Sequence, residues 1–426
     1  MLIVSLGFLA CIILKNPLCI ICFSFCFLLY LNERFHSKRV LIFFIGLSVL
    51  SLFLVKPCKE AEKGIYTVTE IKQSYYVAEN HGSRVLVQSD LDLNFKDQIQ
   101  IDSLEPIHID DNFTLFSFTK YNASKNIFYK TRNVRLLKKS HSLKSKLYTF
   151  VSNQKNSKVL LSLYYGIHED TIDEIYTMLG YGYISAYFIV FNLLKRKYDE
   201  QKIRKGLLIV SILFGNFFVF TLSLTRFILY QLAYLLFQSK SDQIGFTILF
   251  FSILYPIQVL SISFVLPILL QLVSYFCTEY KWIAQKMVLV SILFIYFKKV
   301  DVVSLLLFNL MRKFYGLIFL VGIFISDFKP FTIPSLTIHY APQYVFIFVF
   351  IVAYIQCLKH FKWKYLIIFL IPFLEVFCNP FFQVYTLNIG QGDCSIIVEP
   401  FYKSVVMIDC GQNLYRDNVE RIIMPF

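Results

Sequence analysis

The chain has 426 residues, of which 57% are hydrophobic and only 16% are charged, and its mean hydropathy is +0.59. A soluble globular protein carries about 25% charged residues, so the composition argues against an ordinary soluble enzyme and indicates an integral membrane protein. The net charge of +14 agrees either with Lys and Arg anchoring cytoplasmic loops or with attraction to a polyanion.

Three apolar runs occupy the N-terminal part of the chain, at residues 2–14, 18–31 and 40–55. A bilayer crossing needs about 20 residues. The first two runs, split by Lys15-Asn16-Pro17, therefore predict a helical hairpin or a re-entrant pair. We expect residues 1–55 to form an N-terminal transmembrane cluster.

The following residues, 56–140, are hydrophilic and alternate in short stretches such as IYTVTEI, YYVAE and RVLVQS. His81-Gly82-Ser83 has the composition of a hairpin turn between two of them. Several short strands with closely spaced turns are typical of a small antiparallel barrel or sandwich. The sequence therefore predicts a β domain here, followed by basic and amphipathic linking helices over residues 141–180.

No carboxylate occurs from Asn112 to His168, where Lys and Arg are interleaved with Tyr and Phe. This combination holds single-stranded nucleic acid through charge neutralisation and base stacking. An anionic lipid surface is a competing partner, because the tract precedes an apolar segment, and a solvated basic face with no specific partner is a third interpretation. The DNA-binding residues predicted here are Lys120, Lys125, Lys130, Arg132, Arg135, Lys138 and Lys139.

Apolar segments fill most of residues 181–379, the last two at 343–357 and 365–378. Breaks at Tyr255-Pro256 and at Phe264–Pro267 predict interrupted helices, which survive at membrane depth only where protein or water satisfies the backbone. The sequence predicts a polytopic α-helical transmembrane domain. The positive-inside rule then places residues 56–180 and the C-terminal segment outside the cytoplasm.

The residues from 380 to 426 form a more soluble segment with three β-type runs, separated by Gly390-Gln391-Gly392-Asp393 and by Glu399-Pro400. Three strands are too few to hold a core of their own. Asp393 and Asp409 flank these strands and fit either a hydrolase site or turn caps. The cysteines have no zinc-site spacing outside an apolar run, and we expect no metal and no cofactor.

Two groups of motifs resemble ComEC-type competence proteins, the inner-membrane channels for DNA uptake in naturally transformable bacteria. LNIGQGDCSIIV followed by VVMIDCG is similar to the family's LDVGQGDSILI and LIDGG at the start of a metallo-β-lactamase-like domain. YISAYFIVF stands in the place of HLLAISGLHV, and Ser-Leu-Thr-Arg226 is similar to Ser-x-x-Arg. The matching residues are Gln391, Gly392, Asp393 and Asp409 at the C-terminal end and Ser185, Arg226, Ser261 and Ser263 in the helical region.

The resemblance implies a plasma-membrane channel that passes single-stranded DNA, lined by Ser185, Arg226, Ser261 and Ser263. It also implies an external OB-fold-like domain over residues 56–140 and a metallo-β-lactamase-like domain beginning in residues 380–426. The family's HxHxDH run would follow Pro425, so we expect no catalytic residues and no enzyme activity.

Other proteins would have to cooperate with such a channel. A DNA receptor and a cytoplasmic ATP-driven motor are the implied partners, because the sequence has no Walker-type GxxxxGK[ST]. A small-solute transporter and a truncated, nonfunctional remnant of a competence protein stay open as alternatives.

Overall fold

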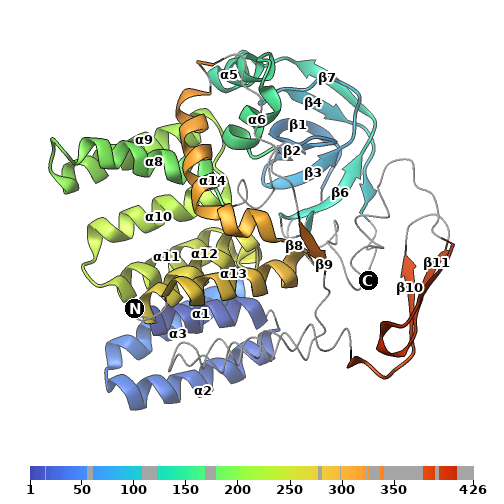
Figure 1. Ribbon diagram of the computed structural model, residues 1–426. Helices are drawn as coiled ribbons and strands as arrows, with labels where there is room; N and C mark the ends of the chain where they lie inside the picture. Colours follow the sequence, from blue (N-terminus) through green and yellow to red (C-terminus); the bar gives the residue numbers. More distant parts are fainter. Residues whose placement is uncertain are drawn as a thin grey trace. The chain divides into compact units, whose positions relative to one another are not determined.

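The computed structural model (Figure 1) divides into two compact units. The first comprises residues 1–108, 119–268 and 308–332, and the second comprises the other segments; each is described by itself. The structure describes residues 1–14, 16–54, 61–107, 122–123, 125–167, 179–276, 281–297, 299–322, 324–325, 336–339, 378–388 and 393–409.

The three N-terminal apolar runs are helices: α1 (Leu2–Leu14), α2 (Pro17–Phe35) and α3 (Lys38–Leu54). The polar break between α1 and α2 is the point where α2 begins. The Asn16 side chain caps this helix by accepting the Leu18 N–H, and Pro17 occupies its first turn. Two helices separated at the polar break are therefore present as predicted, although α2, with 19 residues, is longer than its apolar run.

Several of the remaining helices fall on apolar segments of residues 181–379, whereas α9 begins in the polar residues 200–205 and α5 and α6 lie in the basic linking region. The predicted break at Tyr255-Pro256 is confirmed, because a helix ends at Leu254 and a 3-10 turn covers Pro256–Gln258. The second predicted break is wrong, because Pro267 lies inside a continuous helix. The helices are α5 (Leu143–Ser152), α6 (Ser157–Tyr165), α8 (Tyr181–Leu194), α9 (Glu200–Phe217), α10 (Leu222–Leu236), α11 (Lys240–Leu254), α12 (Ile262–Phe276), α13 (Lys281–Phe297) and α14 (Val302–Val321).

The predicted polytopic α-helical membrane protein is wrong. Among the described residues, α2 alone is long and apolar enough to cross a bilayer, and the bent pair Val302–Phe308 and Leu310–Val321 would make a second span. A span near the N-terminus with the same composition also occurs as a signal sequence, so α2 does not establish a multi-pass protein. The predicted segment 343–357 and most of 365–378 lie outside the described residues.

The reason for the error is the length of the helices and the use of their apolar residues. The apolar helices α1, α8, α10 and α12 have at most 15 residues, about 22 Å at 1.5 Å per residue, against a hydrocarbon core of about 30 Å. In α11, which also has 15 residues, nine residues are buried inside the protein. The apolar residues of such helices are explained by packing against other helices as readily as by contact with lipid, so hydropathy alone does not identify a membrane span.

The predicted β domain is one seven-stranded sheet in the order β5-β6-β3-β2-β1-β4-β7. The β3–β6 pair is parallel and the other five pairs are antiparallel. The strands are β1 (Gly64–Ile71), β2 (Tyr76–Asn80), β3 (Ser83–Val87), β4 (Gln98–Ile101), β5 (Glu105–Pro106), β6 (Ile127–Thr131) and β7 (Val134–Lys138).

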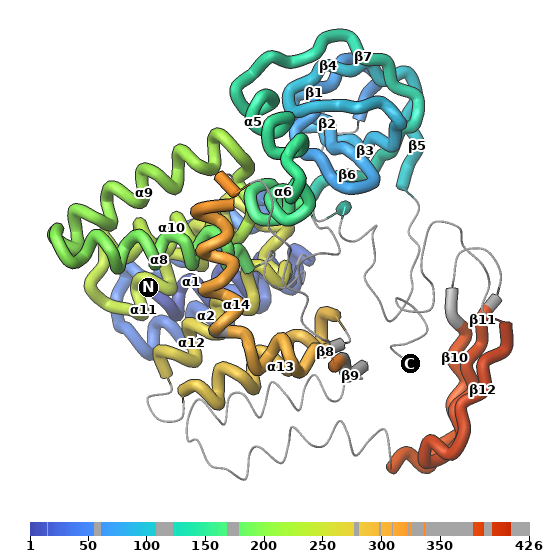
Figure 2. Tube along the Cα trace, turned by 45° about the horizontal axis from the view of Figure 1, so that its top comes forward, coloured from blue at the N-terminus to red at the C-terminus, as the bar shows by residue number. Residues whose placement is uncertain are grey.

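Chain connectivity requires this sheet to curl. β6 and β7 are separated by Arg132 and Asn133 alone, so Thr131 and Val134 lie within about 11 Å of each other along the chain. In a flat sheet, five strand spacings of about 4.8 Å would put these strands roughly 24 Å apart. Register shifts between Val68 and Glu70 and in β3 and β4 bend the strands, and the result is a half-barrel (Figure 2).

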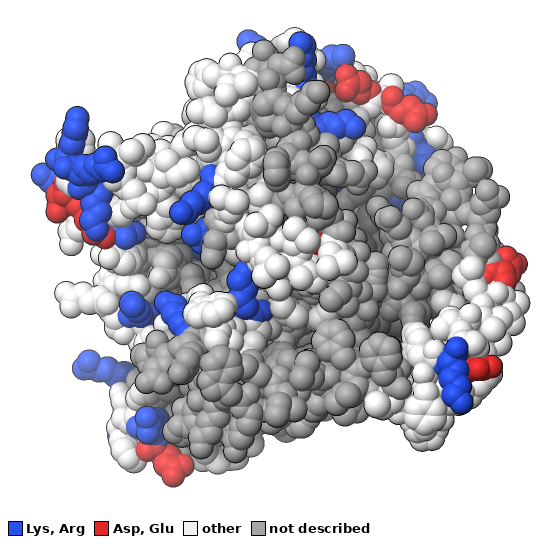
Figure 3. All heavy atoms as spheres, viewed as in Figure 1, with Lys and Arg blue, Asp and Glu red and all other residues white. Residues whose placement is uncertain are grey.

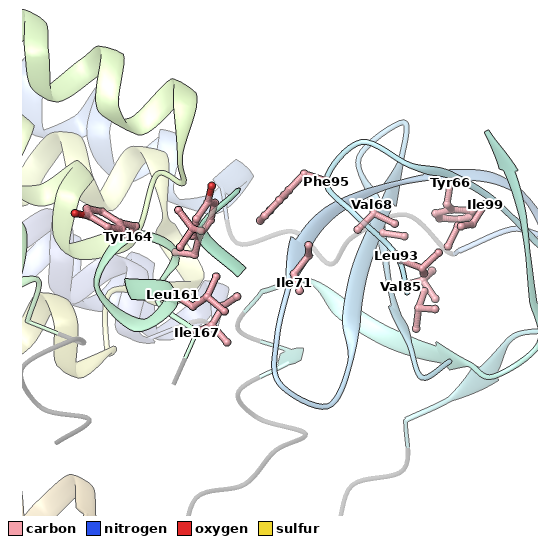
Figure 4. Packing of buried hydrophobic residues seen from close by; sticks show 14 of the residues in the cluster. Tyr66, Val68, Ile71, Val85, Leu93, Phe95, Ile99, Leu161, Tyr164 and Ile167 are labelled. Carbon is pink, nitrogen blue, oxygen red and sulfur yellow. The ribbon is translucent and has the colours of Figure 1, made fainter. Parts of the chain in front are cut away.

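The concave side of the sheet holds a hydrophobic core that continues into α6. Tyr66, Val68 and Ile99 are fully buried on the strands, and Leu161 and Tyr164 join them from the helix. Figure 4 shows Phe95 between the sheet residues and these two helix residues. The loop that carries Phe95 is therefore anchored from both sides.

The described part of the second unit contains two small antiparallel sheets. β8 (Lys299–Asp301) pairs with β9 (Thr337–His339), and β10 (Gln383–Asn388), β11 (Asp393–Val398) and β12 (Val405–Ile408) form a meander. The meander falls on the three predicted β-type runs. Ile396 is 2% exposed, whereas every residue of β12 is exposed.

Candidate nucleic-acid interface

A groove of about 750 Å³ opens on the β domain where three chain segments meet. These segments are β1, the loop before β4, and the stretch that joins β7 to α5. None of the described groove residues is acidic. They are Thr67, Val68, Thr69, Phe95, Lys96, Gln98, Lys138, Lys139, Ser140, His141 and Lys144.

Asp97 holds two walls of the groove together. Its carboxylate is 1% exposed and accepts the Asn94 N–H at 2.8 Å and the Ser140 N–H at 2.7 Å. Backbone hydrogen bonds connect β1, the third wall, to the loop before β4. The Lys96 N–H donates to the Val68 carbonyl at 2.8 Å, and the Val68 N–H donates to the Asp97 carbonyl at 2.9 Å. A buried carboxylate that accepts two backbone N–H groups makes strong, charge-assisted hydrogen bonds, so the groove is preorganised.

The cations of the groove have few competing partners within the protein. Lys96, Lys138 and Lys139 are exposed, and no carboxylate of the described chain forms a salt bridge with any of the three. Lys96 has a left-handed backbone with φ of 65°, a conformation that is uncommon outside glycine and that the hydrogen bonds around Asp97 maintain.

The N-terminus of α5 adds to the positive potential of the same groove. Ser142 caps the helix, because its hydroxyl accepts the Ser145 N–H. The first turn of a helix carries a partial positive charge, and here it lies next to Ser140 and His141. Anions are therefore favoured at this end of the groove.

Lys144 covers an aromatic ring inside the groove. Its Nζ lies 4.7 Å from the centroid of the Phe95 ring. Burial lowers the pKa of Lys144, and the neighbouring Lys96 lowers it further. Phe95 is 2% exposed and stacks on Tyr165, with 5.6 Å between ring centroids.

Three of the predicted DNA-binding residues are paired with carboxylates instead. Lys125 belongs to a part-buried cluster around Glu70, at 3.3 Å from its carboxylate, with Arg84 as a further partner. Lys130 pairs with Glu105 at 3.7 Å and Arg135 pairs with Asp102 at 3.4 Å. Of the other predicted residues, Arg132 is exposed and Lys120 lies outside the described residues.

Glu70 is the centre of the first of these clusters. Burial alone would raise the pKa of Glu70, but Lys125, Lys72 and Arg84 together outweigh it and hold the pKa well below its ordinary value. Lys125 is therefore engaged in stabilising the β1–β3 part of the sheet.

The structure brings Lys138 and Lys139 from the predicted set into the groove and adds Lys96, Lys144 and His141. Lys144 belongs to the carboxylate-free tract, so composition pointed toward it. Lys96 is surrounded in sequence by Asp90, Asp92, Asp97 and Asp102, and sequence reasoning missed it for that reason.

The residues expected to line a channel lie in the helical part of the first unit. Arg226 is 5% exposed and donates an N–H to the Ser263 carbonyl oxygen, four residues before Pro267. Ser185 and Ser261 each have a buried hydroxyl with no hydrogen-bond partner among the described residues. Arg226 and Ser263 are thus brought together.

The residues expected at the start of a metallo-β-lactamase-like domain are described in part. Asp393 begins β11 and Asp409 follows β12 with a φ of 55°, whereas Gln391 and Gly392 lie outside the described residues. Within the described segments, no three His, Cys, Asp or Glu side chains gather as a metal site would require.

Comparison with protein-family models, with curated proteins and with solved structures finds no match for this chain. The resemblance to ComEC-type proteins therefore depends on the motifs given above.

Proposed function

We propose that this protein binds single-stranded DNA in the groove of its β domain and takes part in DNA uptake at the plasma membrane. The observation that carries the proposal is the set of four groove lysines, Lys96, Lys138, Lys139 and Lys144, in a groove whose described lining residues include no Asp or Glu. Phosphodiester backbones are bound by such cations, with release of counterions. The hydroxyl and amide groups of Thr67, Thr69, Gln98 and Ser140 supply further hydrogen bonds.

The concave form of the site favours a strand over a lipid surface. A groove of about 750 Å³ has the size of a ligand pocket, and its lysines come from the loop before β4 and from the stretch that joins β7 to α5. An anionic bilayer is flat on this scale and would be met by exposed cations such as Arg132. Small curled β domains also bind single strands in many proteins.

The membrane part of the proposal is supported by α2. Leu18, Ile21, Phe25 and Leu29 are between 56% and 72% exposed, and their spacing of three and four residues puts them on one helix face. Figure 3 shows Lys and Arg gathered at the turn between α8 and α9, and Lys and Arg interspersed with Asp and Glu on the β domain. A DNA receptor and an ATP-driven motor are the partners that the resemblance implies.

Salt-dependent binding tests the DNA part of the proposal. The full chain, kept in detergent, is titrated with fluorescent oligo(dT) at rising salt, followed by anisotropy. With four lysine–phosphate contacts, the logarithm of the affinity should fall with the logarithm of salt with a slope of about −3. Lys138→Ala and Lys139→Ala should each reduce that slope by about 0.7.

Arg135→Ala is the matched control, because Arg135 lies on the same strand as Lys138 but is paired with Asp102. An affinity that does not change with salt would contradict the proposal. Binding to phosphatidylserine vesicles without binding to the oligonucleotide would point to lipid instead. Deleting the gene and scoring transformation tests the role in uptake.

A further inference from the structure

We propose that the Phe95 ring is a base-stacking subsite, which a nucleotide base enters when Lys144 leaves the ring for a phosphate. The inference deepens the proposed function and rests on it. The Phe95 subsite would be the feature by which the groove selects single strands.

The ring is built into the protein like a platform. It stacks on Tyr165 at 5.6 Å with an interplanar angle of 24°, and Tyr148 meets it edge-on at 5.3 Å. The Asn94 side chain accepts the Phe95 N–H at 2.7 Å, and the Asn94 amide also donates to the Thr149 hydroxyl of α5 at 2.9 Å. The backbone and the ring are thereby fixed before any ligand binds.

The side of the ring that faces the groove is covered by a removable group. Phe95 and Lys144 both line the groove, and the Lys144 ammonium lies over the ring. A lysine side chain has a flexible four-carbon stem, so the ammonium can move without any change in the backbone. The same movement would uncover an aromatic face inside a cationic groove.

The environment of Lys144 favours this exchange when a strand arrives. The ammonium is partly buried and is repelled by Lys96, and both effects lower its pKa. The other charged or titratable groups among the described groove residues are Lys138, Lys139 and His141, none of which is acidic. Glu70 raises the pKa of Lys144, but burial and Lys96 lower it by more. A phosphate would supply the counter-ion that Lys144 lacks in the groove.

The energies of the two ring contacts also favour replacing the Lys144 ammonium on the Phe95 ring by a base. A cation over a ring is worth only a few-fold in an equilibrium constant at a partly exposed site, whereas a base on an aromatic ring is worth about tenfold or more. Bases in a duplex are already stacked and paired. A subsite of this kind therefore accepts single strands and has little preference among the bases.

Two oligonucleotides with the same phosphates but different bases test the inference. The full chain in detergent is titrated with oligo(dT) and with an abasic strand of equal length, about 16 nucleotides, the upper end of single-domain site sizes. We expect oligo(dT) to bind about tenfold more tightly at every salt concentration. Equal affinities for the two strands would overturn the inference while leaving the proposed function intact, and failure of both strands to bind would overturn both.

Variants locate the effect. Lys144→Met should reduce the salt slope by about 0.7 and keep the preference for the base-bearing strand, whereas Lys146→Met, on the same helix but outside the groove, should change neither. Phe95→Leu should bring the two affinities together. If Phe95→Leu does not fold, the comparison of the two strands on the unmodified chain still decides the question.

Discussion

Neighbouring lysines of the β domain have different roles because their surroundings differ. Lys125 lies against the Glu70 carboxylate, and its side chain is 12% exposed. Lys138 is exposed and lines the groove. The ion pair with Glu70 occupies Lys125, whereas Lys138 is accessible to an anion in the groove. The same residue type therefore stabilises the sheet at one position and attracts a ligand at another.

The Glu70 cluster gives the β domain a stability that depends on pH. Because its pKa in the folded state is below its ordinary value of 4.5, Glu70 contributes stability above that pH, and the contribution is lost as pH falls toward the lower folded-state pKa. Glu70→Gln should cost roughly 2 kcal/mol at neutral pH, because part-buried cations lose their partner. Hydrogen exchange of β1 and β3 measures this cost.

The difference between Glu70→Gln and the unmodified chain should shrink as pH is lowered to about 3, where the unfolded carboxylate is protonated. Glu79→Gln is the control, because Glu79 is 42% exposed and lies 3.7 Å from Arg84, and its effect should be smaller. A difference that stays constant with pH would show that Glu70 acts by packing and not by charge.

At the scale of the element, α12 stays continuous through Pro267 because another helix supplies a donor. Proline has no N–H, so the carbonyl four residues earlier, that of Ser263, loses its intrahelical donor. Arg226 of α10 donates to that carbonyl oxygen. The sequence shows an arginine within an apolar segment and, separately, a proline within another, and the structure connects the two through the hydrogen bond from Arg226 to the Ser263 carbonyl.

A double-mutant cycle tests this account of α12. Arg226→Met should cost about 1.5–3 kcal/mol, the range for a hydrogen bond to a charged group. In a Pro267→Ala background, the alanine N–H can donate to Ser263, and the cost should fall by about 1 kcal/mol. Thermal unfolding of the four proteins in one detergent gives the coupling energy. Additive effects would mean that Arg226 acts independently of the proline.

At the scale of the whole molecule, large exposed apolar side chains occur on several helices, α2, α3, α9 and α14 among them, where Leu18, Ile42, Ile209 and Leu306 are at least 60% exposed. Monomeric soluble proteins rarely expose large contiguous apolar patches. The exposed side chains of α2 recur on one face, Arg34 lies in the last turn of this helix, and Lys38 and Arg39 begin α3. Such a distribution suits contact with an anionic bilayer.

Vesicle flotation tests the membrane attachment. Replacing Ile21 and Phe25 by glutamate should abolish co-flotation, because each charge adds about 3 kcal/mol to insertion at the centre of an apolar helix. The double variant Lys138→Ala/Lys139→Ala should float like the unmodified chain while binding DNA more weakly. Undiminished flotation of the α2 variant would show that attachment occurs elsewhere in the chain.

The sequence predicted individual elements well, because each depends on nearby residues. The apolar segment 181–194 is α8, and the β-type runs near the C-terminus are β10, β11 and β12. The strands β6 and β7 were missed, because the density of Lys and Arg in residues 127–138 drew attention to charge and away from alternation. Hydropathy also misjudged the class of protein, because it does not distinguish a lipid-facing side chain from one buried between helices.

The sequence by itself determined the composition of each segment: where helices start, where turns interrupt them, and where carboxylates are absent. Only the tertiary structure decided which lysines are available to an anion. Their availability depends on which residues the curled sheet brings together, such as Lys96, which precedes β4 in the chain, and Lys138, which follows it. Electrostatic pairing acts over a few ångströms in space, and sequence distance carries little information about it.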